Sequence, residues 1–367
     1  MGWTFSHSPA AFLRAAEPFL LARPVENSVL LTVTDTLRRR GLSAYGDEPP
    51  LFGWWRPAQD PDPAGADAAA YRGPSHDADA DLGPDPAPHP GAPTVQAAFL
   101  RTPPHPPLLT RAPAAAAAEL AAAWAAEPLA EVRGDHEAVT AFADAWSARA
   151  RAPYRVTERI RFHELGTLVP RVPGPPGHAR IADAADRELL IRWQQEMDAE
   201  IGHPTPGRPT VADDAILHGL RTLWIGPGGE PVAMAGRTLE VAGSVRVVAV
   251  YTPPGQRGRG YAGGAVTAVT QAALDAGVHR VLLVTDLANP VSNGLYHRLG
   301  YRPVRDGLRV ALGAGEAAGV PDAAGGTRGA SGVGRDAAGG TREVPAEAVG
   351  APGVGRGAPD HDRHAPA

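Results

Sequence analysis

The chain has 367 residues and a formal net charge of −5, and this length suggests about two domains. It contains no cysteine, which excludes disulfides, thiolate zinc sites and a cysteine nucleophile, and no lysine, so all 35 basic residues are arginine. The slight acidity gives no sign of a nucleic-acid-binding surface, and no uncharged apolar run is long enough to predict a membrane span. We therefore expect a soluble cytoplasmic protein without nucleic-acid or membrane partners. The oligomeric state stays open.

The first part of the chain alternates predicted helices and strands. Helices are predicted over 8–24 and 25–41, the second with Gly41 as its C-terminal cap. Strands are predicted over 50–57 and 94–102. Further along, the pattern predicts helices over 113–126 and 135–150, an extended segment over 154–169 and a Pro/Gly-rich linker over 170–178.

Two segments have compositions that favour disorder. Residues 58–93 are rich in Asp, Pro, Ala and Gly, and residues 313–367 are rich in Gly, Ala and Pro, with DAAGGTR and GVGR each occurring twice. Neither segment has the apolar periodicity of a packed element. The acidic run HDADADLGPD lacks the full ligand pattern of an EF-hand loop, and we expect no metal site.

The pattern changes after the linker, where short strands and helices follow one another closely. The predicted elements are a strand, turn and amphipathic helix over 179–202, a hairpin over 222–237, a strand over 244–254, a helix over 264–277, a strand over 279–286 and a helix over 289–300. The last helix has clear end signals, with Asn289 at its N-cap, Pro290 at its first position and Gly300 just beyond its end.

Residues 253–264, PPGQRGRGYAGG, join a strongly β-prone strand to a helix. A helix N-terminus carries partial positive charge and unpaired N–H groups. Gly258 and Gly260 would let phosphate oxygens approach the backbone, and Arg257 and Arg259 would add cationic donors. The stretch therefore predicts a pyrophosphate cradle, although a flexible turn with solvated arginines is the plainer alternative.

Two better-known phosphate motifs do not fit this stretch. The P-loop is excluded because its GK[ST] ending is missing. Gly258, Gly260 and Gly263 match the spacing of the dinucleotide fingerprint G-x-G-x-x-G. That fingerprint needs an acidic residue at a strand end about 20 residues on, whereas Asp275 lies inside the predicted helix.

RGRGYA (257–262) is similar to the R/Q-x-x-G-x-G/A loop of the GNAT acetyltransferase superfamily. The surrounding order also resembles this family, from RIADAADRELL through PVAMAGR, VVAVYTPP and VLLVTDLANP to SNGLYHRLGYRPV. The resemblance covers 174–312. It implies an α+β GNAT fold, with a mixed, mostly antiparallel central sheet flanked by helices. A second α/β domain over 1–173 would precede it, with 58–93 as a disordered insertion, and the tail over 313–367 would follow.

The resemblance implies an acetyl-CoA-dependent N-acetyltransferase, in which an amine attacks the thioester directly in a ternary complex. Tyr296 would protonate the leaving CoA thiolate, and it shares a helix face with Asn293. The residues that would bind acetyl-CoA are Val250, Tyr251 and Thr252 along the pantetheine arm, Arg257, Gly258, Arg259, Gly260, Tyr261 and Ala262 around the pyrophosphate, and Asn289 and Asn293 beside the pantetheine.

Several of these residues have a purely structural alternative. Asn289 could be only a helix cap. Tyr296 could be a core aromatic with a satisfied hydroxyl. Tyr251 could simply pack on the sheet.

The general base and the acceptor are not identified by the sequence. The strand residues 245–251 include no acidic residue, and the candidate carboxylates in the acceptor-side helix and loop are Glu196, Glu200, Asp213 and Asp214. The slight acidity weakly favours a cationic amine, with a small molecule or a peptide as acceptor.

Two other functions stay open beside the enzyme: a non-catalytic acyl-CoA-binding regulatory module and a protein-interaction scaffold. Residues 1–170 could be a degenerate GNAT-like repeat, since they lack the glycine loop and the Asn-Asn-Tyr helix. The aromatic run FGWW (52–55) could line a pocket there, although buried packing is the simpler interpretation.

Overall fold

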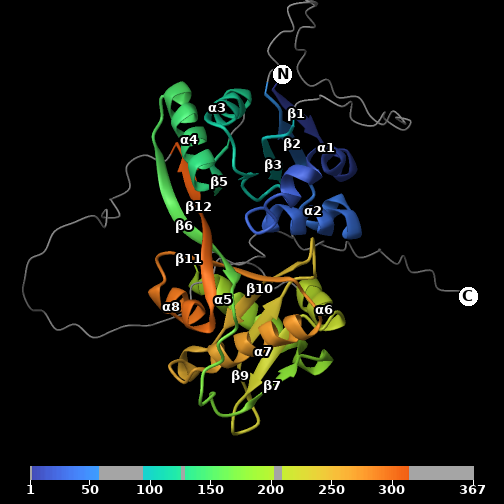
Figure 1. Ribbon diagram of the computed structural model, residues 1–367, viewed down its shortest axis with the longest axis vertical. Helices are drawn as coiled ribbons and strands as arrows, with labels where there is room; N and C mark the ends of the chain where they lie inside the picture. The colour runs from blue at the N-terminus through green and yellow to red at the C-terminus, as the bar shows by residue number, and fades with distance from the viewer. Residues whose placement is uncertain (1, 58–93, 125–128, 202–208, 314–367) are drawn as a thin grey trace, which may run out of the picture.

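The computed structural model describes residues 2–57, 94–124, 129–201 and 209–313. The predicted insertion over 58–93 and all but the first residue of the predicted tail lie outside these residues. Within the part of the chain that is described, all strands belong to one twelve-stranded sheet with helices packed against it. Figure 1 shows the long middle strands running between two groups of helices.

In chain order, the described residues form the following strands, α-helices and 3₁₀ helices. The strands are β1 (Trp3–Ser6), β2 (Leu51–Trp55), β3 (Ala97–Arg101), β4 (Leu108–Leu109), β5 (Glu131–Asp135), β6 (Tyr154–Leu165), β7 (His178–Ile181), β8 (Arg221–Ile225), β9 (Pro231–Arg237), β10 (Ser244–Tyr251), β11 (Arg280–Asp286) and β12 (Tyr301–Leu312). The α-helices are α1 (Pro9–Leu21), α2 (Ser28–Arg40), α3 (Ala114–Ala123), α4 (His136–Ala150), α5 (Arg187–Glu200), α6 (Pro209–Leu217), α7 (Tyr261–Asp275) and α8 (Pro290–Leu299). Three short 3₁₀ helices are η1 (Leu42–Ala44), η2 (Ala184–Asp186) and η3 (Pro254–Gln256).

The order of strands and α-helices is the same in the two halves of the chain. Each half has a strand, two helices, three strands, a helix, a strand, a helix and a last strand, with β1–β6 in the first and β7–β12 in the second. Each half also has one parallel strand pair, β4 with β5 and β10 with β11, whereas the other ladders are antiparallel. The predicted α+β class with a mixed, mostly antiparallel sheet is therefore confirmed.

The two halves exchange their last strands. The sheet order is β1-β2-β3-β4-β5-β12-β6-β11-β10-β9-β8-β7, so β12 lies between β5 and β6, and β6 lies between β12 and β11. The β6–β12 ladder runs from the Tyr301–Leu165 pair to the Leu312–Tyr154 pair, which is the full length of both strands. In Figure 1 these two strands run side by side through the middle of the molecule. Each half thus completes its sheet with a strand from the other.

Helices cover the sheet around separate apolar cores. In the first half, α1 and α2 pack on β2 and β3 around Phe12, Leu30 and Phe52, and α3 and α4 pack on β5 and β12 around Leu120 and Phe142. In the second half, α5 and α6 form one core with β8, β9 and β10, and α7 and α8 form another with β10 and β11. Burial of these side chains is the main force holding the helices to the sheet.

The FGWW run contributes to this packing. Phe52, Trp54 and Trp55 are buried in the cores of the first half, and Gly53 lies against the Phe99 ring.

Among the described residues, no helix is both long and apolar enough to cross a membrane.

Strands β5 and β12 are absent from the sequence prediction, because their sequences break the usual alternation. EVRGD and YRPVRDGLRVAL carry charges, glycine and proline. Their charged side chains pair across neighbouring elements, as Arg305 Nε does with Asp135 Oδ2 at 2.7 Å and Arg161 with Asp306 at 2.7 and 2.9 Å. Such charges are tolerated in a sheet where they meet an opposite partner, as these do. Elements β1, β4 and α6 were also not predicted, and α7 begins at residue 261, earlier than expected.

Gly300 is the position where the backbone after β6 approaches the end of α8 most closely. Its φ is +102°, and a Cβ there would overlap the carbonyl oxygen of Thr167. Gly277, which follows α7, has a similar φ of +82° but open space around it. We expect Gly277→Ala to cost about 1–2 kcal/mol of unfolding free energy from backbone strain alone. Gly300→Ala should cost about 2 kcal/mol more, because the overlap adds to the strain. Urea unfolding of both variants measures the difference, and equal losses would contradict the close approach.

Candidate active site

The parallel strands β10 and β11 pair only at their beginnings. Their ladder joins Ser244–Arg246 to Arg280–Leu282, although both strands continue for several residues. The ladder between β10 and β9 is irregular between Val248 and Tyr251, where Ala249 has a φ of +52°. Over the same length β11 pairs with β6 instead. The carboxyl ends of β10 and β11 therefore belong to different ladders, and the predicted site residues follow these two ends.

The glycine loop leads directly from β10 into α7. Gly258 and Gly260 have φ values of +79° and +86°, which are left-handed conformations that favour glycine. Gly260 is the N-cap of α7, and no side chain of the described residues caps this helix. By contrast, α8 is capped by the side chain of Asn289. The first N–H groups of α7 thus remain available to an anion, as the sequence predicts for a phosphate cradle.

The arginines around the loop differ in their contacts. Arg257 is held by the protein: its Nε donates to the Thr252 carbonyl at 2.9 Å and its Nη2 to Glu200 at 2.6 and 2.7 Å. Arg259 is exposed. Arg171 of the linker, which the sequence prediction missed, lies close to the loop, since a Cβ on Gly260 would be 2.9 Å from its Nη1. Arg259 and Arg171 are therefore the guanidinium groups best placed to meet an anion here.

Tyr251 ends β10 against the acceptor-side helix α5. Its hydroxyl donates to Glu196 Oε2 at 3.0 Å, and Glu200 Oε1 is 3.5 Å away. Burial, followed by this hydrogen bond and the charge of Glu200, raises the pKa of Tyr251 well above its usual value. The phenol is thus a neutral donor at physiological pH, and its ring packs edge-on to Trp193 at 6.1 Å.

The other two site residues of this strand end are buried. Val250 belongs to the core between β10 and α7. Thr252 is buried, and its Oγ1 has no hydrogen-bond partner among the described residues. Tyr261 and Ala262, at the start of α7, pack against Trp224 and the neighbouring cores.

The four candidate carboxylates divide into two groups. Asp213 pairs with Arg187 at 2.6 Å, which lowers the pKa of the Asp213 carboxyl, and Asp214 pairs with Arg40 of α2. Both therefore tie α6 to other helices. Glu196 and Glu200 instead meet at the Tyr251 hydroxyl, at the end of β10. They are the candidates that the structure brings to the predicted site.

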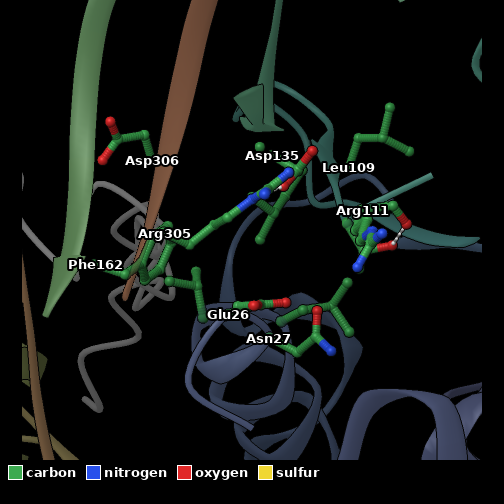
Figure 2. A pocket seen from close by; sticks show the side chains of 13 residues that line it. Glu26, Asn27, Leu109, Arg111, Asp135, Phe162, Arg305 and Asp306 are labelled. Atoms are coloured by element: carbon green, nitrogen blue, oxygen red, sulfur yellow. Dashed lines mark hydrogen bonds and ion pairs between the residues drawn. The ribbon is translucent and has the colours of Figure 1, made fainter. Parts of the chain in front are cut away.

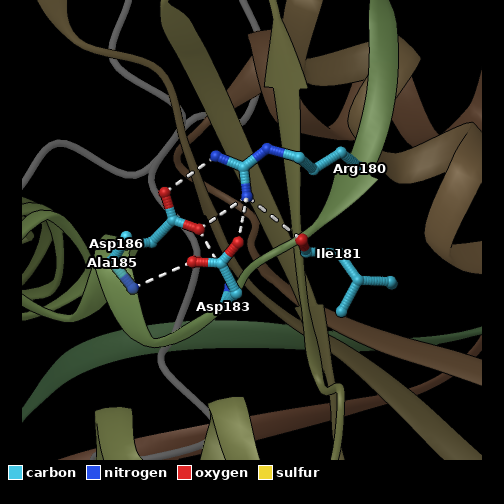
Figure 3. A network of polar contacts seen from close by, with 5 residues as sticks. All are labelled: Arg180, Ile181, Asp183, Ala185 and Asp186. Carbon is cyan, nitrogen blue, oxygen red and sulfur yellow. Dashed lines mark hydrogen bonds and ion pairs between the residues drawn. The ribbon is translucent and has the colours of Figure 1, made fainter.

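Helix α5, which carries Glu196 and Glu200, is fixed at its start by an ion-pair network (Figure 3). Arg180 of β7 donates to the two oxygens of Asp186 at 2.6 and 2.8 Å, and this hydrogen bonding lowers the pKa of Asp186. Asp183 and Asp186 form a capping box over η2, directly before α5. The network sets the direction in which α5 leaves the sheet.

Tyr296 lies one turn after Asn293 on α8 and is completely buried. Its hydroxyl has no hydrogen-bond partner among the described residues. The neighbouring Tyr301, 6.0 Å away between ring centroids, is satisfied by Thr270 at 2.7 Å. A buried hydroxyl without a partner is costly, and a catalytic role is one of the explanations for such a group.

The two predicted asparagines serve the protein's own backbone. Asn289 Oδ1 accepts from the N–H groups of Val291 and Ser292 at 3.1 Å each, so the helix-cap alternative describes its observed contacts. Asn293 Nδ2 donates to the carbonyl oxygens of Asp286 and Asn289 at 2.9 and 2.7 Å. Their contacts with pantetheine stay a prediction. Both hydrogens of Asn293 Nδ2 are already used, so Asn293 could only accept a hydrogen bond from pantetheine, through Oδ1.

A buried chain of polar side chains leads from Asn293 into β6. Thr285 Oγ1 donates to Asn293 Oδ1 at 2.6 Å, and His163 Nε2 lies 3.1 Å from Thr285 Oγ1. His163 is 5% exposed. Burial, followed by the charge of Arg161, lowers the pKa of His163 to about 4, so the imidazole is neutral at physiological pH.

The first half has a pocket of its own, shown in Figure 2. Its lining includes Asn27 at the start of α2, Leu109 of β4, Asp135, and Arg305 of β12. Arg305 points across the pocket toward Asp135 in Figure 2. No glycine loop borders it, because Pro113 is the N-cap of α3, the helix that corresponds to α7. This pocket therefore lacks the phosphate-binding features of the second half.

Among the described residues, no group of three or more possible ligands could hold a metal ion.

The depressed pKa of His163 predicts a loss of stability in acid. The unfolded imidazole takes up a proton near pH 6.5, whereas the folded one does so only near pH 4. Between these values the unfolded state binds more protons, so stability should fall by up to about 1.4 kcal/mol per pH unit as the pH decreases. Urea unfolding at a series of pH values measures the slope. His163→Met should flatten it, and an unchanged slope in that variant would contradict the assignment.

The acetyltransferase (GNAT) family model matches residues 182–301. A solved Drosophila protein matches 84% of this chain and 98% of its own, with 10% identity and a TM-score of 0.51. A GCN5-related N-acetyltransferase from Sphaerobacter thermophilus matches 59% of this chain and 80% of its own, with 17% identity and a TM-score of 0.44. A tandem GNAT protein from the clavulanic acid biosynthesis pathway matches 62% and 82%, with 11% identity and a TM-score of 0.39.

No curated protein sequence matches the chain significantly. The Drosophila protein shares the fold over most of both chains, so the two-half architecture is not peculiar to this sequence. The family match begins just after β7 and ends at the first residue of β12, and it includes α5, the glycine loop, α7 and the buried tyrosine of α8. Residues 182–301 of this chain therefore match the acetyltransferase (GNAT) family model, and this match points to acetyl transfer as the class of reaction.

Proposed function

We propose that the protein is an acetyl-CoA-dependent N-acetyltransferase that moves an acetyl group to an amine by direct attack in a ternary complex. The observation that carries this proposal is the Tyr296 hydroxyl, which is buried without a partner on the helix after β11. An acyltransferase needs a proton donor for its leaving thiolate, and this hydroxyl has no competing partner among the described residues.

The acetyl-CoA site that we propose lies along the carboxyl ends of β10 and β11. The N–H groups at the start of α7 hold the pyrophosphate, and Arg259 and Arg171 add positive charge. Residues 250–252, at the end of β10, pair with the pantetheine arm. Arg257 contributes through its backbone, because its side chain is already bound to Glu200 and Thr252.

Acetyl-CoA supplies the activated acetyl group as a thioester. The amine nitrogen forms a bond to the carbonyl carbon, the carbon–sulfur bond breaks, and Tyr296 gives its proton to the sulfur. Glu196 and Glu200 are the carboxylates that we propose take the proton released by the amine, directly or through water. Arg257 pairs closely with Glu200 at 2.6 Å, whereas Arg192 lies 3.9 Å from Glu196, so Glu196 is the less tightly paired carboxylate, which favours a cationic amine as acceptor.

The remaining assignments are proposals as well. The acceptor is a small molecule or a peptide amine, and the protein acts in the cytoplasm without nucleic-acid or membrane partners. The first half, over 1–173, is a degenerate GNAT-like domain beside the acetyltransferase domain over 174–312. The repeated order of elements in the two halves supports this interpretation.

Binding of the donor is tested first by a thermal-shift titration with acetyl-CoA, CoA and NAD. A ligand that binds only the folded state raises the unfolding temperature. We expect a saturable rise with acetyl-CoA and with CoA, and none with NAD. No rise with either CoA species, together with no heat of binding by calorimetry, would favour the scaffold function.

Gly260→Asp and Gly260→Asn form a matched pair at the proposed cradle. Both side chains tolerate a positive φ, so the backbone strain is similar and only the charge differs. The aspartate would repel the pyrophosphate and draw Arg171 away from it. We expect acetyl-CoA to bind the Asp variant at least about tenfold more weakly than the Asn variant, as measured by calorimetry. Equal affinities would mean that the anion binds elsewhere.

Tyr296→Phe tests the proton donor. The hydroxyl has no protein partner, so its removal should leave the stability unchanged or slightly higher. We expect kcat to fall about 100-fold, with little change in acetyl-CoA affinity. Tyr301→Phe is the control, because it removes a neighbouring buried hydroxyl that is bonded to Thr270 and should cost about 1 kcal/mol of stability but little kcat. A Tyr296→Phe enzyme with normal kcat at saturating acceptor would remove Tyr296 from this role.

A further inference from the structure

His163 belongs to the first half of the chain, but its side chain is directed into the candidate active site of the second. It lies on β6, opposite Leu283 of β11, which makes Thr285 its diagonal neighbour on the same face of the sheet. Its Nε2 is 3.1 Å from Thr285 Oγ1, and that hydroxyl is 2.6 Å from Asn293 Oδ1. Three buried or half-buried side chains thus connect β6 to α8.

The hydrogen bonds that link His163, Thr285 and Asn293 can run in only one direction. Asn293 faces two carbonyl oxygens, of Asp286 and Asn289, so its Nδ2 must point toward them and its Oδ1 toward Thr285. Thr285 has a single hydroxyl proton, which it gives to Asn293 Oδ1. It can therefore only accept from the imidazole, and His163 must carry its proton on Nε2.

The other imidazole nitrogen agrees with this assignment. His163 Nδ1 is buried and has no hydrogen-bond partner among the described residues. A bare nitrogen lone pair there costs less than an unpaired N–H would, because a buried donor without an acceptor is the rarer case. The Nε2 proton therefore has one destination, the Thr285 hydroxyl.

The chain of bonds ends on the turn that begins α8. Asn293 holds the carbonyl oxygens of Asp286, at the end of β11, and of Asn289, at the N-cap of α8. Its backbone N–H also bonds the Asn289 carbonyl at 3.2 Å, and Tyr296 follows one turn later. The orientation of Asn293 thus sets where α8 starts and where the Tyr296 hydroxyl lies.

We propose that His163 is a positioning residue for acetyl transfer, which acts through Thr285 and Asn293 on the placement of the Tyr296 hydroxyl. The inference rests on the proposed function of Tyr296 as proton donor. It gives the first half of the chain a specific role in the reaction, since β6 supplies the hydrogen-bond donor to the Thr285 hydroxyl. A proton donor that is displaced by a fraction of an ångström transfers its proton poorly, so the effect is on kcat.

A matched pair of substitutions separates the hydrogen bond from simple packing. His163→Gln places an amide N–H near the position of Nε2, and His163→Met fills similar space without any donor. We expect kcat of the Met variant to fall about tenfold, with KM for acetyl-CoA changed less than about twofold, because the pyrophosphate is held at the start of α7, to which this hydrogen bond does not connect. The Gln variant should recover most of the lost kcat.

A second pair of substitutions tests Thr285, the next residue in this series of hydrogen bonds. It keeps the inference testable if a His163 variant does not fold. Thr285→Val has the shape of threonine without the hydroxyl, and Thr285→Ser keeps the hydroxyl. We expect the Val variant to lose kcat as His163→Met does, and the Ser variant to retain it. Amide hydrogen exchange at Asn293 should be faster in the Met and Val variants than in the wild type and normal in the Gln and Ser variants.

The outcomes distinguish this inference from the proposed function. If the wild type transfers no acetyl group to any amine in a broad panel, the proposed function fails, and with it the role of His163. If the wild type is active but His163→Met keeps its kcat, or if the Gln and Met variants lose kcat equally, the positioning role is overturned while the function stands. Loss in the Met and Val variants with recovery in the Gln and Ser variants supports it.

Discussion

The antiparallel ladder between β6 and β12 is the contact on which both halves of the molecule depend. Without β12, the edge of β5 would have no partner on that side, and without β6 the same would hold for β11. An unpaired strand edge exposes backbone N–H and C=O groups that must find other partners. Each half therefore completes the other, and ion pairs such as Arg161–Asp306 bind the same two strands together through their side chains.

This exchange also determines what shapes the candidate active site. Since β10 and β11 are joined only at their beginnings, the far end of β11 depends on β6 for its ladder. The position of α8, which follows β11, is then set from β6 as well, through the His163 bonds and through the backbone after β6 that contacts Gly300. The residues that match the family model are continuous in sequence, but the sheet to which they belong is not complete without the first half.

Local signals explain why much of the second half could be predicted from the sequence. Asn289 and Gly300 end α8 as expected, because a cap depends only on residues within one turn. The glycine loop was recognised because positive φ values at Gly258 and Gly260 need a specific residue type. The second half also carries a hairpin, in which β8 and β9 pair antiparallel across a short Gly/Pro turn.

What could not be predicted involves residues far apart in the chain. Arg171 lies next to Gly260 only because the linker folds back over the loop, and Arg257 binds Glu200 across 57 positions. The charged strand β12 forms because its partners on β5 and β6 neutralise it, which no local pattern reveals. The choice between helix cap and ligand contact at Asn289 was likewise open, since both use the same side-chain oxygen.

The two halves share one arrangement of elements but differ where the chemistry would occur. In the second half, two left-handed glycines bring the chain from β10 into an uncapped helix. In the first, β4 has only two residues, and Pro113, with φ fixed at −57°, precedes α3. A proline cannot adopt a positive φ, so the corresponding turn cannot form the same cradle. A repeated fold thus carries the features of a donor site only once, because those features depend on a few loop residues and not on the sheet.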